Sequence, residues 1–249
     1  MSAYEPRLYR AVMEAGDLET FNVTVRETDL TIRAERDLSE EALRLVTAVR
    51  EDLETFLDRW PVARDSFVPL EVPESAPSIV RRMADAGAIA GVGPMAAVAG
   101  AVAEDVGRGL MAYSRTVIIE NGGDVFMTST QPRSVVLFAG ESPLSGKVAF
   151  VVRPPQMPIG VCTSAGTVGH STSLGRADAA VVFAPDAAIA DAVATGLGNR
   201  VHSGADIEAA LDWALSLPQV TGAAVVVGER IGIRGAVELA PAGSGQGVE

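Results

Sequence analysis

The strongest folding signal in this chain is Thr116-Val-Ile-Ile-Glu-Asn-Gly-Gly-Asp-Val-Phe126. Its β-branched first half predicts a strand, and the apolar pair Val125-Phe126 follows the polar centre. Gly122 and Gly123 can take positive φ at the centre without strain, and Asn-Gly is typical of a tight hairpin turn. Asn121 and Asp124 can bond either to this turn or to a ligand. The segment therefore predicts antiparallel sheet, and both a purely structural turn and a ligand-binding turn remain open.

Short β-branched or aromatic runs continue the strand pattern on both sides of this turn. We expect strands at 21–25, 30–34, 116–119, 134–138, 148–152, 160–162, 179–183, 223–227 and 232–239, the first two and the last two forming hairpins. Apolar residues at helical spacing predict helices at 38–60, 78–86, 94–109, 186–197 and 205–215. Because strands and helices do not alternate regularly, the sequence favours an α+β fold with mixed or antiparallel sheets and packed helices.

Three prolines between residues 64 and 77 mark a surface connection early in the chain. We therefore expect residues 1–75 to form an N-terminal hairpin and helix portion, and residues 76–240 to form the core that carries the site. The Gly- and Ser-rich residues 241–249 are expected to be a flexible tail.

The composition excludes several classes of function. The 249 residues carry a net charge of -12, so phosphate backbones and anionic lipid are poor partners. Cys162 is the single cysteine and cannot form an internal disulfide. The N-terminus lacks the apolar core of a signal peptide, and the Ala- and Gly-rich run Ala86–Val102 is too short to span a membrane. We expect a cytoplasmic protein with no nucleic-acid or membrane partner, and a homodimer from base rates.

A second polar segment, residues 162–175, is rich in hydroxyl side chains and glycines. Such a loop offers neutral donors and close backbone approach, which suit an anionic or polyhydroxylated ligand, although a merely flexible loop has the same composition. His170 lies inside this loop and is either a surface histidine or a ligand contact.

A third segment places Asp191 and Thr195 four residues apart in an otherwise apolar helix. Their carboxylate and hydroxyl share one face of the helix, within reach of one small ion. Mg²⁺ is suited to such a site, because it takes few protein oxygens and completes its shell with water and substrate phosphate. The alternative is an aspartate that favours the helix N-terminus through the dipole, with the threonine bonding back into the helix.

Taken in order, these segments resemble the ApbE superfamily of magnesium-dependent flavin transferases over roughly residues 85–240. The motifs are Asn121-Gly-Gly-Asp124 after a strand, Thr163-Ser164 with a nearby Gly166, and Ala190-Asp-Ala-Val-Ala-Thr195 ahead of a glycine. Gly91-Val-Gly-Pro-Met95 and Gly169-His-Ser171 are similar to a short cytosolic branch of that superfamily. The resemblance implies enzymes that bind FAD and transfer its FMN half onto a threonine or serine of a target protein, or hydrolyse FAD to FMN and AMP.

The resemblance also implies roles for individual residues. Asp191 and Thr195 match the side-chain ligands of Mg²⁺, and the backbone carbonyl of Cys162 matches a third ligand. The residues implied to bind the flavin are Asn121, Gly122, Gly123, Asp124, Thr163, Ser164, Gly166 and Thr167. His170 and Asp124 are the implied catalytic residues.

Three functions therefore stay open. The first is an ApbE-like protein that binds a flavin or related nucleotide with Mg²⁺ and transfers or hydrolyses its FMN or phosphoryl group. The second function is a non-catalytic nucleotide-binding or assembly protein. It stays open because residues 93–99 carry no charge, whereas the family has a Lys-Gly pair and an Asp there. The third is an enzyme for another phosphorylated metabolite, with His170 as acid or base near Glu104, Asp105 or Asp124.

Overall fold

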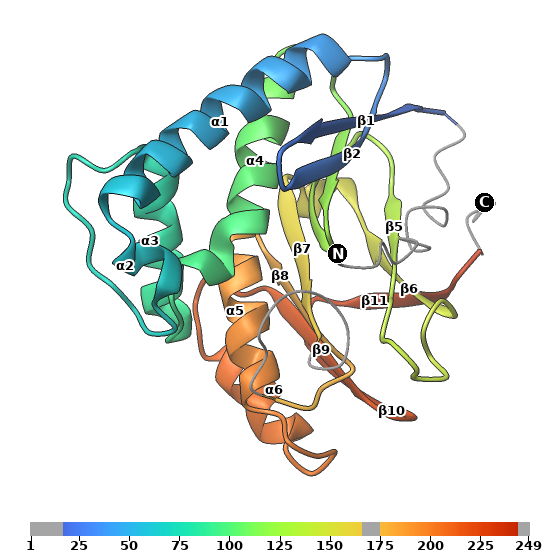
Figure 1. Ribbon diagram of the computed structural model, residues 1–249. Helices are drawn as coiled ribbons and strands as arrows, with labels where there is room; N and C mark the ends of the chain where they lie inside the picture. The colour runs from blue at the N-terminus through green and yellow to red at the C-terminus, as the bar shows by residue number, and fades with distance from the viewer. Residues whose placement is uncertain (1–16, 166–174, 244–249) are drawn as a thin grey trace.

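The computed structural model describes residues 17–165 and 175–243 of the chain. The predicted site residues Gly166, Thr167 and His170 therefore lie outside the described residues. The fold is α+β, as the sequence predicts, and each described strand pair is antiparallel. It comprises a long sheet, a short sheet and a set of helices, arranged as three layers (Figure 1).

The long sheet has eight strands in the order β1-β2-β3-β4-β7-β8-β9-β10. Their bounds are β1 Glu19–Val25, β2 Thr28–Ala34, β3 Val117–Asn121, β4 Asp124–Thr128, β7 Ile159–Ser164, β8 Ala179–Ala184, β9 Gly222–Val227 and β10 Arg230–Gly235. The short sheet has the order β11-β6-β5, with β5 Arg133–Val136, β6 Val148–Val152 and β11 Glu238–Pro241.

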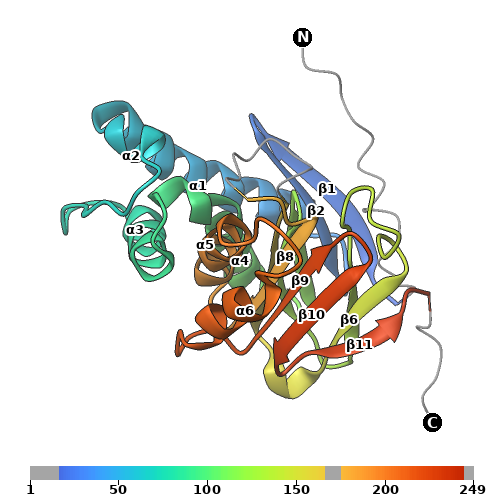
Figure 2. The same cartoon turned by 90° about the horizontal axis from the view of Figure 1, so that it is seen from below.

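The helices cover one face of the long sheet, and the short sheet covers the other (Figures 1 and 2). The helices are α1 Ser39–Arg59, α2 Val62–Asp65, α3 Ser78–Ala90, α4 Val98–Leu110, α5 Ala187–Asn199 and α6 Ile207–Leu215, with short 3₁₀ turns η2 Pro94–Ala97 and η3 Pro154–Gln156. Strand alternation divides the buried residues between two cores. In β3, for example, Val117 and Ile119 pack under the helices while Ile118 packs under the short sheet.

Helix α1 forms where the sequence predicts it. Its buried residues Ala42, Val46, Leu53 and Leu57 recur at helical spacing, and Glu40 and Glu41 lie in the first turn, where negative charge suits the helix dipole. This helix lies across α4 and the β1–β2 hairpin, and so forms the outer wall of the helical layer (Figure 1).

The predicted last hairpin is only partly right, because the strand expected at 232–239 is two strands. β10 pairs with β9 and ends at Gly235, where φ is +79°. The amide of Ala236 then donates to the carbonyl of Thr221 at 2.8 Å, which turns the chain away from the long sheet. The residues that follow form β11 and pair with β6 of the short sheet.

The small residues of the predicted Ala- and Gly-rich helix pack inside the chain. At Gly100 of α4, a Cβ atom would lie 2.2 Å from the carbonyl oxygen of Ala187 in α5. At Gly107, a Cβ atom would lie 2.3 Å from a ring carbon of Phe126 in β4. The glycines therefore allow α4 to touch both α5 and the sheet, and this face of α4 is used within one chain.

No single helix in residues 17–165 and 175–243 is long and apolar enough to cross a membrane. The consecutive helices Ser78–Ala90 and Pro94–Leu110 reach that length and apolar character only when taken together, and they are bent by 101° relative to each other.

We predict that Gly100→Ala lowers the free energy of unfolding by roughly 1–3 kcal/mol, since backbone atoms of Ala187 occupy the space that the methyl group needs. The matched control is Gly109→Ala on the same helix, where the new Cβ would meet only the flexible end of Leu45. In that control, better helix propensity offsets the contact. Urea unfolding of both variants checks the prediction, and equal losses would contradict it.

Candidate functional site

The predicted turn at residues 121–124 is a hairpin turn between β3 and β4. Asn121 pairs with Asp124, and Gly122 and Gly123 between them have φ of +74° and +138°. The turn also makes two longer-range contacts. The side-chain amide of Asn121 donates to the carbonyl of Ala99 at 3.1 Å, and Oδ1 of Asp124 accepts from the amide of Thr163 at 3.2 Å. The turn therefore joins the start of α4 to the end of β7.

Asp191 reaches the same place from α5. Its Oδ2 accepts from the backbone amide of Gly100 at 2.9 Å, in the first turn of α4. The N-terminus of α5 is held in return by α4, because Oε2 of the buried Glu104 accepts from the amide of Ala187 at 2.6 Å. Each helix thus supplies a carboxylate to the other helix's N-terminus, where the free amides and the dipole favour negative charge.

Burial and neighbouring negative charge raise the pKa of three groups at this point. Burial is the main cause that raises the pKa of Asp124 from its ordinary 3.8 to about 7, and the charge of Glu120 adds to it. Loss of water around the carboxylate, and then the charge of Asp124, raise the pKa of Asp191 well above its ordinary value. Burial, followed by the charges of both aspartates, raises the pKa of the Cys162 thiol. The three groups interact electrostatically and so lie in one region.

The Thr163-Ser164 pair divides between the two faces of the long sheet. Cys162 packs in the core under the helices while Val161 packs in the opposite core, so alternation places Ser164 on the helical side and Thr163 on the other. Thr163 therefore meets the site through its backbone amide, and the buried Ser164 lies on the face of Cys162.

The structure brings Asp124, Cys162 and Asp191 together, and Thr195 follows one turn after Asp191 in α5. Among the residues that the structure describes, no three His, Cys, Asp or Glu side chains are grouped so as to hold a metal ion. A cation here would rely on the carboxylate of Asp191, the hydroxyl of Thr195 and carbonyl oxygens. Such a small set of hard oxygen ligands fits Mg²⁺ better than zinc or iron.

Two of the three acids considered as partners of His170, namely Glu104 and Asp105, have partners within the described residues. Oε1 of Glu104 accepts from Arg108 at 2.6 Å while its Oε2 holds α5. Asp105 forms an ion pair with Arg82 at 2.8 Å. Both carboxylates therefore serve the packing of α4.

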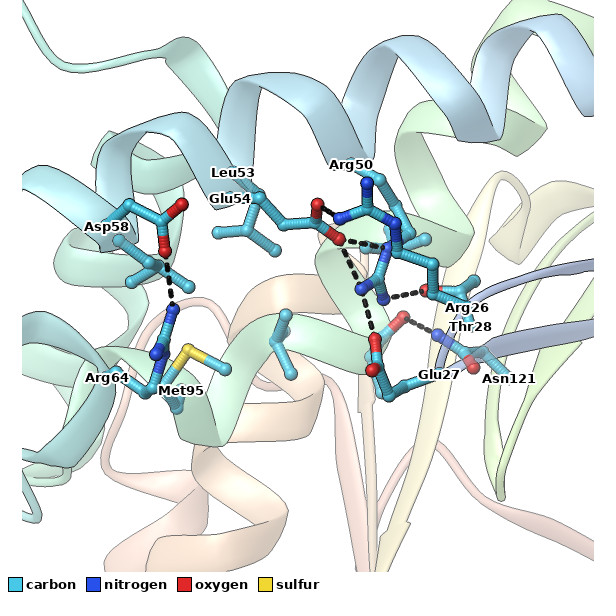
Figure 3. Close-up of a pocket in the computed structure, with 14 residues that line it drawn as sticks. Arg26, Glu27, Thr28, Arg50, Leu53, Glu54, Asp58, Arg64, Met95 and Asn121 are labelled. Atoms are coloured by element: carbon cyan, nitrogen blue, oxygen red, sulfur yellow. Dashed lines mark hydrogen bonds and ion pairs between the residues drawn. The ribbon is translucent and has the colours of Figure 1, made fainter. Parts of the chain in front are cut away.

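A groove of about 570 Å³ opens between α1, the β1–β2 turn and the start of α4 (Figure 3). Apolar side chains from α1, η2 and α4 form its floor, namely Leu53, Leu57, Met95, Val98 and Val102. Its inner end is formed by Ala99 and Asn121, the pair joined by the hydrogen bond from the hairpin turn. The volume is in the range of sites for small organic molecules.

Charged residues form the rim of this groove, and they are paired with one another. Arg50 of α1 bonds to the hydroxyl of Thr28 at 2.8 Å and to Glu54 at 2.9 Å, and it also pairs with Glu27. Arg26 pairs with the same Glu54. At the other end, Arg64 pairs with Asp58 at 3.3 Å.

No pattern in the sequence predicts this groove. Arg50 and Glu54 are four residues apart on α1, which is the ordinary spacing of ion pairs on an exposed helix face. The other lining residues come from segments far apart in the chain. A non-glycine residue with positive φ, Arg26 at +54°, marks the β1–β2 turn, but no sequence pattern indicates that conformation.

We predict that the contribution of Asp124 to the stability of the protein without metal falls as pH rises from about 4 to about 7. The folded-state pKa of Asp124 lies above its ordinary 3.8, so the folded protein binds this proton more tightly throughout that window. Asp124→Asn removes this contribution while keeping an oxygen that can accept from Thr163. The stability difference between the variant and the native protein should therefore change by about 4 kcal/mol across the window.

Urea unfolding at several pH values, in the presence of a chelator, measures this difference. Asp52→Asn, on the exposed face of α1, is the matched control and should leave the profile unchanged. Identical pH profiles for the native protein and Asp124→Asn would contradict the shifted pKa.

Solved structures share this fold. The apo form of the flavinyl transferase ApbE from Pseudomonas stutzeri superposes with a TM-score of 0.57 at 14% sequence identity, over 87% of this chain and 93% of that chain. The ApbE protein of Thermotoga maritima gives a TM-score of 0.55 at 11% identity, over 86% of this chain and 96% of that chain. The overall arrangement of helices and sheets is therefore that of ApbE proteins.

Relatives at higher identity extend over most of the chain. The UPF0280 protein of Methanocella arvoryzae is 39% identical over 218 residues, covering 87% of this chain and 89% of that protein. The UPF0280 protein of Methanosphaerula palustris is 44% identical over 209 residues, covering 83% and 86%. The ApbE resemblance predicted from three short motifs is confirmed. A family model described as "AbpE bacteria" matches residues 10–234, and the chain therefore belongs to that family.

Proposed function

We propose that this protein binds a flavin nucleotide such as FAD together with Mg²⁺ and breaks the pyrophosphate of that nucleotide. The observation that carries the proposal is the convergence of Asp124 and Asp191, from a hairpin turn and a helix, at the N-terminus of α4. The groove of about 570 Å³ is lined by Ala99, which precedes Gly100, and by Asn121, which pairs with Asp124. The fold that the chain shares with proteins named as flavin transferases supports the same reading.

The chemistry of the donors supports a divalent cation at the aspartates. Burial raises the pKa of both carboxylates, and the charge of Asp124 raises that of Asp191 further, so a cation that compensates this negative charge would be favoured here. We propose that Asp191, Thr195 and the backbone carbonyl of Cys162 hold Mg²⁺. When bound, the ion would neutralise charge on the pyrophosphate and on the leaving phosphate.

The residues of this chain would then position the substrate and accept a proton. The hydrogen bond from Gly100 fixes the carboxylate of Asp191, and the hydrogen bond from Thr163 fixes that of Asp124. We propose that Asp124 takes the proton of the attacking hydroxyl group, since a pKa of about 7 suits a general base near neutral pH. A new bond forms from the hydroxyl oxygen to the FMN phosphorus, and the bond from that phosphorus to AMP breaks.

Two acceptors fit this step. If the hydroxyl belongs to a threonine or serine of a target protein, the product is a flavinylated protein, and if it belongs to water, the products are FMN and AMP. Asn121, Gly122, Gly123, Thr163 and Ser164 are proposed contacts of the nucleotide. Gly166, Thr167 and His170 are proposed as further contacts from the loop outside the described residues.

The proposal extends to the setting of the reaction. Residues 76–240 would supply the acidic groups, while the hairpin and α1 of residues 1–75 would supply the outer wall of the groove. We propose a cytoplasmic protein whose partner is a nucleotide and not a nucleic acid, in keeping with the net charge of -12. A homodimer is proposed on base rates alone.

We predict that the native protein converts FAD to AMP and FMN when Mg²⁺ is present. Asp191→Asn should lower the rate roughly a hundredfold, because the amide cannot supply the negative charge that a cation site needs. Chromatographic separation of the products measures both rates, and a chelator should abolish the native activity.

Asp52→Asn on the exposed face of α1 is the control and should retain the native rate. Full activity of Asp191→Asn would contradict the proposed metal site. A native protein that binds FAD but releases no AMP with any divalent ion would instead support the non-catalytic nucleotide-binding protein.

A further inference from the structure

The groove between α1 and α4 has a rim that carries no net charge. Its six charged side chains are three arginines and three acids, and each one is in an ion pair within the rim. The side chain of Arg50 is only 13% exposed and that of Glu54 22%, so their pairing is largely shielded from water. A phosphate group would have to draw Arg50 away from Glu54 and leave the largely buried charge of Glu54 without this partner, which is unfavourable.

The floor of the groove is apolar and accessible from the rim. Met95 and Val98 are partly exposed, while Leu53 and Leu57, which line the groove from α1, are buried. A thioether and branched aliphatic side chains form good contacts with the faces of aromatic rings. The floor therefore suits a flat, uncharged ring and gives no reason to bind an anion.

The position of the groove links such a ring to the aspartates. Ala99 and Asn121 close its inner end, and the next residue, Gly100, donates to the carboxylate of Asp191. A molecule with a ring in the groove and a charged group beyond Asn121 would span both features. Figure 3 shows this end of the groove, with Asn121 beside the β1–β2 turn.

We propose that the groove between α1 and α4 binds the uncharged heteroaromatic ring of the substrate, while the pyrophosphate lies outside it at Asp124 and Asp191. The inference rests on the proposed function for the identity of the nucleotide, and the groove itself adds which part of that nucleotide it holds. Because no free charge lines the groove, ring binding requires no Mg²⁺ and changes little with salt concentration.

The test uses riboflavin and adenosine, which carry the two candidate rings without phosphate. The full-length protein should quench riboflavin fluorescence, or release heat with adenosine in calorimetry, equally well with Mg²⁺ or chelator and at low or high NaCl. The probe that binds identifies the ring. Failure of both probes to bind would overturn the proposal.

Two variants test the place of binding. Val98→Trp fills the groove and Met95→Glu puts a charge on its floor, so each should weaken ring binding about tenfold or more. Val68→Trp is the matched control, because this valine is 64% exposed in the loop after α2 and does not line the groove. Circular dichroism checks that each variant folds. If one groove variant does not fold, the other still tests the place of binding.

The outcomes separate this inference from the proposed function. Weakened ring binding in both groove variants, with native ring binding in Asp191→Asn and Val68→Trp, supports it. If the groove variants bind FAD and the ring as the native protein does, the ring does not bind in the groove, but the proposed metal-dependent reaction is not contradicted. Ring binding without any metal-dependent FAD cleavage would instead contradict the proposed function and leave the groove as a ring site.

Discussion

The contact on which this structure depends is the reciprocal pairing of α4 and α5. Asp191 accepts from Gly100 at 2.9 Å, and Glu104 accepts from Ala187 at 2.6 Å, so each helix stabilises the other's N-terminus. The two bonds require close approach of the backbones. A side chain at Gly100 would meet Ala187 at 2.2 Å, and a side chain at Gly160 of β7 would meet it at 2.5 Å. Without this approach, Asp191 would not lie beside the sheet.

The same contact explains how a desolvated carboxylate is tolerated. Burial and the charge of Asp124 both raise the pKa of Asp191, and each favours the neutral form. The amide of Gly100 and the dipole of α4 oppose this and favour the charged form. The helix-capping interpretation and the ion-binding interpretation of Asp191 are therefore compatible, because a carboxylate held in place by one oxygen is also positioned for a cation.

Local sequence patterns predicted most of the helices and strands. They could not predict how residues from distant segments come together in the site. The β-branched run and the Asn-Gly pair predicted β3 and indicated a hairpin turn, since both signals lie within a few residues, but β4 was not among the predicted strands. Spacing alone left Asp191 open to a helix-dipole role and to metal binding, and its nearness to Asp124 followed only from family resemblance. The groove was missed because its walls come from segments far apart in the chain. The strand at 232–239 was wrong because Gly235 ends β10 within an otherwise continuous β pattern.

The long sheet does not close into a barrel, and β10 is one of its two outer strands in the described part of the chain. An outer strand can recruit a strand from a second molecule and start aggregation. Here Arg230 and Arg234 place positive charge near both ends of β10, and Arg234 is tied to Glu208 and Asp212 of α6. Those charges would repel an identical strand laid alongside. Self-association of this protein, if it occurs, is therefore disfavoured at β10 and would use another surface.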